Sequence, residues 1–231
     1  MIDIVKEAAL KAGDLIFSFW GKKQKLIAKE DKSDFATQVD KQAEDIIFDI
    51  LRSKYPRYNL LSEEAGKINN DSDYCWVIDP LDGTLAYNSR MPNFGVSIGL
   101  LHNQEPILGV INLPAFKELL WAEKGKGAFL NNQKIKVSTT KNLGDAIVGL
   151  EFAHRGGRVQ ELKDYAVPVV DRVRYSPILA CSILGLSYVA RGIYDAYVHY
   201  AYPWDFVGGT AIIQEAGGNV TDNNGKKINW S

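Results

Sequence analysis

Residues 76–84 read Trp-Val-Ile-Asp-Pro-Leu-Asp-Gly-Thr, an apolar run that ends abruptly in two carboxylates, a glycine and a hydroxyl. The β-branched residues of this run favour a buried strand, which its proline and glycine then interrupt. We expect the chain to turn there from a strand into a helix, with Pro80 at the first helical position. That turn would place the side chains of Asp79 and Asp82 about 5–6 Å apart on one helix surface.

The same turn has the groups needed to hold a cation and an anion side by side. Two carboxylates so close repel each other unless a cation lies between them. The backbone amides near Gly83 and Thr84 would point outward from the helix start, where an anion is stabilised. However, Asp-Pro and Asp-Gly are ordinary turn dipeptides, and aspartate is a common helix cap. Taken alone, residues 76–84 leave both interpretations open.

Length and composition are typical of a globular protein. The chain has 231 residues, of which 46% are hydrophobic and 24% charged, enough for one core or two closely joined halves. The formal net charge of −1 gives no reason to expect nucleic acid or a membrane as partner. Cys75 and Cys181 are expected to be buried free thiols rather than disulfide or zinc ligands. No run approaches the roughly 18 apolar residues of a membrane helix or forms a signal peptide, so we expect a cytoplasmic protein.

Periodicity predicts helices first and then mostly strands. Apolar residues at helical spacing indicate a first helix that ends near Gly21 and a second that begins near Asp40. β-type runs predict strands at residues 59–61, 74–79, 94–102, 107–113 and 119–123, and a hairpin joining residues 127–130 to 134–137.

A polar stretch at residues 139–144 marks a soft boundary within one compact unit. We therefore expect an N-terminal half, residues 1–140, and a C-terminal half, residues 141–231. The second half is predicted to contain strands at 146–152, 167–171, 194–200 and 219–222, and helices at 178–190 and 206–216. Helices, then a sheet, then alternating strands and helices predict a layered α/β (α+β) architecture rather than a β-sandwich.

Further acidic residues stand at predicted strand ends and helix starts. Glu63 follows a predicted strand, Asp205 comes directly before the last predicted helix, and Asp40 is near the start of the second. A solvated loop for Glu63 and helix caps for Asp205 and Asp40 are ordinary explanations. Together with Asp79 and Asp82, however, they form an oxygen-only donor set without histidine or cysteine. Such a set suits Mg²⁺, Mn²⁺ or Ca²⁺ and argues against zinc or copper.

Several motifs follow one another in a fixed order along the chain. They are Asp40, Ser62-Glu63-Glu64, Trp76 with Asp79-Pro-Leu-Asp82-Gly-Thr84, Pro92-Asn-Phe94-Gly-Val96-Ser97-Ile98, Trp204-Asp205 with Gly208, and Glu215-Ala-Gly-Gly218. This series resembles the signatures of the inositol monophosphatase family, from about residue 34 to about residue 221. The resemblance implies the α-β-α-β-α sugar-phosphatase fold, shared with fructose-1,6-bisphosphatase-like proteins, and hydrolysis of a phosphate monoester.

The resemblance also implies a set of metal ligands. Glu63, Asp79 and the carbonyl of Leu81 would hold one Mg²⁺ ion. Asp79, Asp82 and Asp205 would hold a second, with a third ion or Mn²⁺ also compatible. Paired ions of this kind stabilise the attacking and leaving oxygens of an in-line displacement and lower the pKa of a bound water.

Other residues would act on the water and the phosphate. By the same resemblance, Glu63 and Thr84 would orient the attacking water, with Asp40 hydrogen-bonded to Thr84. The amides of Gly83 and Thr84 would hold the phosphate and stabilise its charge as it reorganises. Asp82 is assigned to the substrate side of the site as well as to the metal.

The substrate side departs from the family pattern. Inositol-specific members carry a glutamate about seven residues before the second-motif aspartate, but here that segment is one residue shorter and His199 is nearest the position. This difference leaves inositol itself in doubt. The turn Ala180-Cys181-Ser182 would meet substrate hydroxyls, although helix initiation explains it equally well. Arg155 and Arg158 could receive a second phosphate or be solvated surface residues. Ala86 replaces the usual asparagine, without touching a metal ligand.

We therefore expect an enzyme: a Mg²⁺-dependent phosphoric monoester hydrolase of the inositol-phosphate phosphatase type, acting on a small sugar or polyol phosphate without a covalent intermediate. Within this class the alternatives are 3′(2′),5′-bisphosphate nucleotidase and fructose-1,6-bisphosphatase activity. An alternative of another class is a non-catalytic metal- or phosphate-binding protein. The family resemblance suggests a homodimer. Family members usually continue with a further strand and helix beyond this length, so the chain is either naturally short or truncated.

Overall fold

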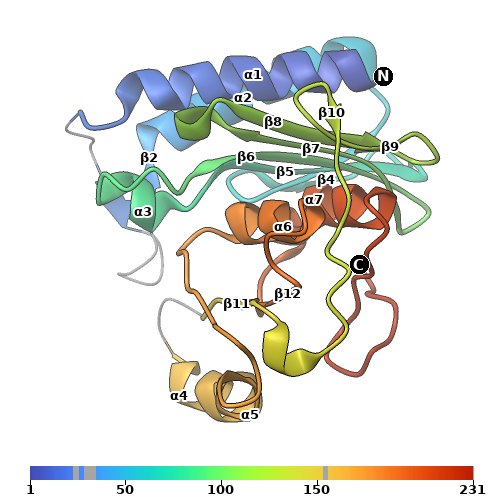
Figure 1. The fold of residues 1–231 in the computed structure, drawn as a ribbon. Helices are drawn as coiled ribbons and strands as arrows, with labels where there is room; N and C mark the ends of the chain where they lie inside the picture. The colour runs from blue at the N-terminus through green and yellow to red at the C-terminus, as the bar shows by residue number, and fades with distance from the viewer. Residues whose placement is uncertain (23–25, 29–34, 153–155, 231) are drawn as a thin grey trace.

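The computed structural model describes residues 1–22, 26–28, 35–152 and 156–230. Its helices and strands form five layers in the order α-β-α-β-α (Figure 1). Helices α1 (Ile2–Phe19) and α2 (Gln38–Lys54) cover one face of the large sheet. Helices α6 (Ser182–Ala190) and α7 (Pro203–Glu215) cover its other face. Beyond them lie the two-stranded sheet of β11 (Val148–Leu150) and β12 (Ala196–Val198), and finally the short helices α4 (Arg158–Glu161) and α5 (Val167–Val170).

The large sheet has eight strands in the order β10-β9-β8-β7-β6-β5-β3-β4. Neighbouring strands run antiparallel, except that β3 and β5 are parallel. The central strands β5 and β6 are buried almost throughout because helices cover both faces. The strands are β3 (Asn59–Ser62), β4 (Gly66–Ile68), β5 (Tyr74–Asp82), β6 (Gly95–His102), β7 (Glu105–Leu113), β8 (Glu118–Glu123), β9 (Gly127–Leu130) and β10 (Gln133–Lys134).

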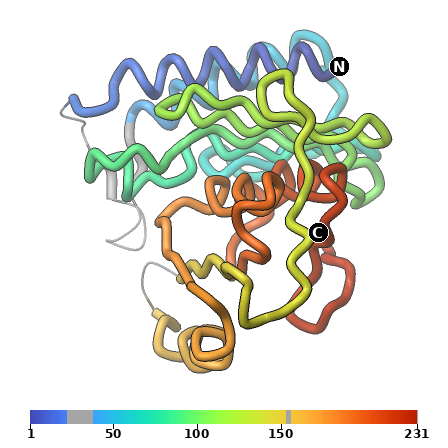
Figure 2. The backbone as a smooth tube through the Cα atoms, in the orientation of Figure 1, coloured from blue at the N-terminus to red at the C-terminus, as the bar shows by residue number. Residues whose placement is uncertain are grey.

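Helix α7 lies unusually close to this sheet. A Cβ atom on Gly109 of β7 would come within 2.0 Å of the Gly208 carbonyl oxygen in α7, so only glycine fits there. After β10 the chain leaves the large sheet, builds β11 and the lower helices, and returns through α6, β12 and α7 (Figure 2). The close approach of α7 places the beginning of that helix against the same sheet that carries β5.

Most predicted elements are present, including both N-terminal helices and the hairpin at Asn131. The strand predicted at residues 167–171 is wrong, because Val167–Val170 form helix α5. Tyr165, Ala166 and Val169 pack that helical segment against the small sheet, whereas Val167 and Val170 are exposed. The β-branched residues suggested a strand, but burial of one helical face decided the structure. The strand predicted at 219–222 is also absent, since the described residues after α7 contain no strand.

The described part of the chain contains two further short strands, β1 (Leu26–Ala28) and β2 (Phe35–Thr37), which pair antiparallel. A single-turn helix, α3 (Thr84–Asn88), follows β5. No helix among the described residues is long and apolar enough to cross a membrane. The division near residue 140 stays a prediction.

Candidate metal and phosphate site

The site lies where β5 leaves the sheet, and the strand continues further than predicted. It runs through Pro80 to Asp82, and its register against β6 shifts between Asp79 and Asp82. The prediction that Pro80 begins a helix, with the two aspartates one helical turn apart, is therefore wrong. Proline, which cannot donate to a ladder, is tolerated where the pairing is irregular. Helix α3 begins only at Thr84.

Three carboxylates meet at this irregular strand end. Asp79, Asp82 and Asp205 each offer one oxygen, and these oxygens all lie within 4.8 Å of one another. Burial raises the pKa of Asp79 well above its usual range, and the neighbouring charges of Glu63, Asp82, Asp205 and Asp40 raise it further. A divalent cation would relieve this repulsion, and carboxylate oxygens are the ligands that Mg²⁺, Mn²⁺ and Ca²⁺ take. The residues present fit such an ion.

The parallel pairing of β3 with β5 brings Glu63 to the site. Ser62 lies opposite Ile78 in the register, and the amide of Glu63 donates to the Ile78 carbonyl at 3.3 Å. Glu63 and Asp79 therefore occupy equivalent places just beyond this pair. The buried Glu44 of α2 supports the arrangement, because its carboxylate accepts hydrogen bonds from the Ser62 hydroxyl and from a loop amide.

The sequence interpretation missed Glu44. Its one signal is its position four residues after Asp40, which puts both on one helical face. Asp40 and Glu44 are both buried. A buried, same-face acidic pair on an amphipathic helix is unusual because apolar residues normally fill such positions.

Asp82 is held from the start of helix α6. The thiol of Cys181 donates to Oδ2 of Asp82 at 3.0 Å, and the amide of Ile183 donates to the same oxygen at 2.8 Å. Burial raises the pKa of the Cys181 thiol well above its usual range, and the adjacent Asp82 adds to the effect. Cys181 is thus a neutral hydrogen-bond donor. The predicted buried free thiol is confirmed for Cys181, whereas Cys75 is free but only half-buried.

Asp205 lies within the first turn of α7 rather than before the helix as predicted. Oδ2 of Asp205 accepts a hydrogen bond from the amide of Tyr202, the N-cap residue, at 2.8 Å. This is one half of a capping box. The capping role and membership of the carboxylate cluster are compatible, because the carboxylate has two oxygens.

The turn between β5 and α3 requires glycine at position 83. Gly83 has φ of 80°, and a Cβ atom there would lie 2.3 Å from the carbonyl oxygen of Asn93. Next to it, the hydroxyl of Thr84 donates to the carbonyl of Leu81 at 3.0 Å. The predicted hydrogen bond between Asp40 and Thr84 stays a prediction.

The structure brings the predicted substrate turn close to Asp82. Ala180 adopts a left-handed conformation, with φ of 55°, immediately before α6. The Ser182 hydroxyl lies 3.2 Å from Nδ1 of His199, so these two predicted substrate contacts are adjacent. Arg155 lies outside the described residues. Arg158 is exposed at the start of α4, in the layer beyond the small sheet.

Two further residues near this turn, each with a buried polar atom, were also missed by the sequence interpretation. Glu151 follows β11 and is 8% exposed. Tyr197 lies in β12, and its pKa is raised well above the usual range by burial and then by Glu151, Asp82, Cys181 and Asp205. Both residues occur in runs that read as ordinary strands, so the sequence carried no signal for them.

The chain matches the model of the inositol monophosphatase family over residues 1–231. A Thermotoga maritima protein named fructose-1,6-bisphosphatase/inositol-1-monophosphatase is 35% identical over 220 residues, covering 95% of this chain and 83% of the relative. An inositol-1-monophosphatase of Synechocystis is 38% identical over 228 residues, covering 95% and 78%. An Escherichia coli protein named Nus factor SuhB is 35% identical over 233 residues, covering 96% and 85%.

Solved structures agree with these sequence relatives. The extragenic suppressor protein suhB from Bartonella henselae superposes with a TM-score of 0.93 at 32% identity, covering 99% of this chain and 90% of that one. The inositol monophosphatase from Anabaena superposes with a TM-score of 0.85 at 35% identity, covering 98% and 85%. From the match over its whole length and from these relatives, the chain belongs to the inositol monophosphatase family.

Proposed function

We propose that this protein is a Mg²⁺-dependent phosphatase that hydrolyses a small sugar or polyol phosphate monoester. The observation that carries the proposal is the cluster of Asp79, Asp82 and Asp205, whose carboxylate oxygens lie within 4.8 Å of one another. The phosphatase names of several relatives support the reaction class. The oxygen-only donor set favours Mg²⁺, with Mn²⁺ as a substitute.

In this proposal the acidic residues share the metal-binding task. Glu63, Asp79 and the Leu81 carbonyl hold one ion, and Asp79, Asp82 and Asp205 hold a second. When bound, such ions lower the pKa of a water and stabilise the oxygens of the displacement. The buried hydrogen bonds to Oδ2 of Asp82 fix its carboxylate in place before any ion binds.

The turn after β5 would receive the phosphate. The amides of Gly83 and Thr84 donate to phosphate oxygens, and the Thr84 hydroxyl together with Glu63 orients the attacking water. Asp40, in helix α2, forms a hydrogen bond with Thr84. The turn at Ala180–Ser182 and His199 would then face the alcohol part of the substrate, with Arg155 as a further contact to be tested.

Phosphate release across a substrate panel tests the proposal. The panel contains inositol monophosphates, fructose 1,6-bisphosphate and 3′-phosphoadenosine 5′-phosphate, each with Mg²⁺, with Mn²⁺ and with a chelator. We expect turnover of at least one monoester, dependent on the divalent ion. Turnover of the bisphosphates alone would favour the nucleotidase or bisphosphatase alternative. Metal binding without turnover of any monoester would instead favour the non-catalytic alternative.

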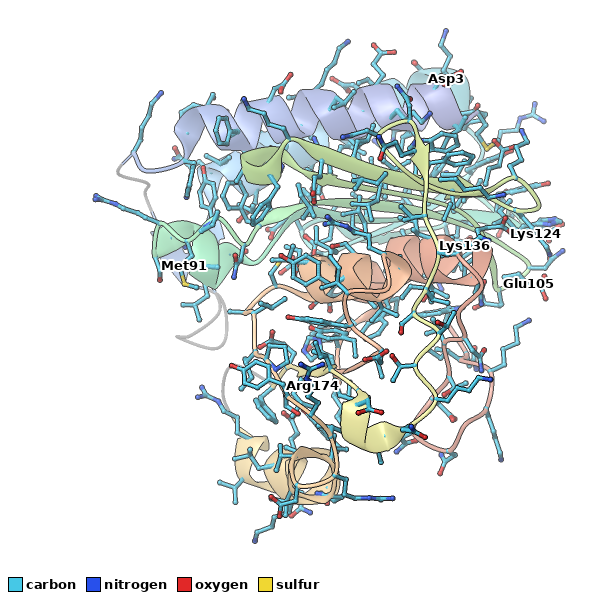
Figure 3. All side chains as sticks on the ribbon, in the orientation of Figure 1. Asp3, Met91, Glu105, Lys124, Lys136 and Arg174 are labelled. Atoms are coloured by element: carbon cyan, nitrogen blue, oxygen red, sulfur yellow. The ribbon has the colours of Figure 1, made fainter. Side chains whose placement is uncertain are left out.

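Asp79→Asn and Asp3→Asn form a matched pair for the same assay. Asp79 belongs to the cluster, whereas the Asp3 side chain is 93% exposed at the far end of α1 (Figure 3). We expect Asp79→Asn to abolish activity and Asp3→Asn to retain it. Unchanged turnover in Asp79→Asn would contradict the metal assignment.

We further propose that the protein is a homodimer and that it is located in the cytoplasm. Light scattering of the purified chain tests the first and fractionation of cells tests the second. A monomer at micromolar concentration would contradict the dimer.

A further inference from the structure

The small sheet and the residue that follows β11 present two polar side chains to helix α6. In its register Gly149 lies opposite Tyr197 and Leu150 opposite Val198. The Glu151 amide donates to the Val198 carbonyl at 3.1 Å, so Glu151 continues the same pairing. Side chains alternate along strands. Leu150 and Val198 accordingly pack into the cluster beside α4 and α5, which leaves Glu151 and Tyr197 on the opposite face, toward α6 (Figure 1).

The ring of Tyr197 is fixed between this sheet and α6. A Cβ atom on Gly149 would lie 2.9 Å from Cδ2 of the ring, and one on Gly185 would lie 2.4 Å from its Cε2. The ring therefore fills the space that two glycines leave open. Its hydroxyl oxygen is buried and has no hydrogen-bond partner among the described residues. A buried tyrosine hydroxyl normally finds a partner, because an unmade hydrogen bond costs free energy.

Glu151, which directly follows the neighbouring strand β11, also has a buried polar atom without a hydrogen-bond partner in the described part of the chain. Its Oε2 atom is buried and lacks a hydrogen-bond partner among the described residues. Burial raises the pKa of Glu151, and backbone hydrogen bonds from Ala180, Phe152 and Leu179 oppose that effect. The first and last of these amides belong to the segment that leads directly to Cys181. Glu151 therefore lies against the turn that holds Asp82.

The two groups complement a hydroxyl and disfavour an anion. The Tyr197 hydroxyl stays protonated, since burial and the surrounding acidic residues raise its pKa, so it can donate. The free oxygen of Glu151 can only accept while the group is ionised. A substrate hydroxyl would accept from Tyr197 and donate to Glu151. A second phosphate at the same place would be repelled by Glu151 and by Asp82.

We propose that Glu151 and Tyr197 bind a hydroxyl group of the substrate's alcohol moiety, beside the Ala180–Ser182 turn. This inference rests on the proposed phosphatase function and narrows its substrates to those with an uncharged hydroxyl, rather than a second phosphate, at this place. A site built to hydrogen-bond a hydroxyl discriminates strongly against an analogue that lacks it, because its buried polar groups then stay unpaired.

Tyr197→Phe tests the inference, because it removes one oxygen and keeps the ring between the two glycines. kcat/KM is measured for the polyol or sugar monophosphate that the wild type hydrolyses best, for its singly deoxygenated analogues, and for p-nitrophenyl phosphate, which has no alcohol hydroxyl. Glu151→Gln is measured in the same way. Tyr194→Phe is the matched control, since the Tyr194 ring also contacts the Gly149 position and is buried.

We expect Tyr197→Phe to lower kcat/KM for the polyol phosphate by about tenfold more than for the aryl phosphate, the size of one hydrogen bond. For one deoxygenated analogue, Tyr197→Phe should lower kcat/KM no more than it does for the aryl phosphate. That analogue lacks the hydroxyl that Tyr197 would bind, so the hydrogen bond is already absent in the wild type. Tyr194→Phe should affect all substrates alike. Equal losses on every substrate in Tyr197→Phe and Glu151→Gln would overturn the inference and indicate a structural pair bridged by a buried water. Absence of wild-type turnover on every substrate would count against the phosphatase function instead.

Discussion

At the scale of single residues, Asp79 is a carboxylate whose charge is costly to bury in the metal-free protein. Its carboxylate is 1% exposed and lies among four other acidic side chains that raise its pKa. A group whose pKa is raised by folding stabilises the folded state below its unfolded pKa, and that contribution is lost as the pH rises through the raised value. The metal-free protein should therefore lose stability as the pH rises above the ordinary range of an aspartate pKa.

Asp79→Asn should remove this pH-dependent loss of folding stability. Without metal at pH 8, the variant should be more stable than the wild type by about 1–3 kcal/mol, because it no longer buries an unpaired charge. That corresponds to a rise in Tm of roughly 2–4 °C per kcal/mol. Thermal unfolding with a chelator and with added Mg²⁺ measures both effects. Mg²⁺ should raise the Tm of the wild type and of Asp3→Asn, but not that of Asp79→Asn. A metal-free variant less stable than the wild type at pH 8 would contradict the expectation.

The role of Cys181 follows from its hydrogen bond to the proposed metal ligand Asp82. Its thiol and the Ile183 amide donate to the same oxygen of Asp82, so Cys181→Ala removes one of these two hydrogen bonds. We expect Cys181→Ala to weaken Mg²⁺ binding by about tenfold, as for other groups that orient a metal ligand. Cys181→Ser supplies a hydroxyl donor and should stay close to the wild type. Calorimetric titration with Mg²⁺ measures this, with Cys75→Ser as the control. Equal affinity in Cys181→Ala and Cys181→Ser would show that the donor is unimportant.

At the scale of elements, the turn from β5 to α3 depends on one glycine. Gly83 and Gly125 have nearly the same φ, 80° and 79°, but only Gly83 has a backbone atom within 4 Å of a Cβ position. Gly125→Ala should cost only the strain of a left-handed alanine, about 1–2 kcal/mol. Gly83→Ala should cost clearly more, because the turn must also move away from Asn93. Urea unfolding of both variants makes the comparison, and equal losses would contradict it.

The same element shows where local patterns succeed and fail. Residues 76–78 read correctly as a buried strand because that pattern depends on the strand's own residues. The helix expected at Pro80 did not form, since pairing with β6 continued through the irregularity as far as Asp82. Likewise, the valines of α5 suggested a strand, but packing of Tyr165 and Ala166 selected a helix. In both cases a tertiary contact outweighed a local preference.

At the scale of the whole molecule, the candidate metal site lies at one end of the large sheet. A group of surface ion pairs around Glu105 lies at the other end. Figure 3 shows Met91 beside α3 at one end, and Glu105 with Lys124 at the other. Glu105 forms ion pairs with Lys124 and Lys227 at 3.0 and 2.7 Å, and these bonds lower the pKa of Glu105 to about 2. The groups are exposed, so we attribute little stability to them.

Trp230 joins distant parts of the molecule. It is 7% exposed and packs in one cluster with Val77 of β5, Leu101 of β6 and Val207 of α7. Trp230→Ala should destabilise the protein by about 3–5 kcal/mol, the usual cost of deleting a buried large aromatic side chain. Trp230→Phe should recover part of that loss. Chemical denaturation of the two variants measures the difference, and a loss below about 1 kcal/mol for the alanine variant would indicate that the contact is dispensable.

The sequence alone was enough to predict the strand leading to Asp79 and the amphipathic helices, because each depends on the type and spacing of nearby residues. The oxygen-only donor set follows from residue types along the whole chain. Its motifs also identified the family to which the chain belongs. Which distant groups meet depends on how the layers pack in three dimensions. Cys181 reaches Asp82 across 99 positions of the chain, and Glu151 and Tyr197 face α6 because of the register of two three-residue strands. Such contacts are set by the packing of the layers, which no local pattern encodes.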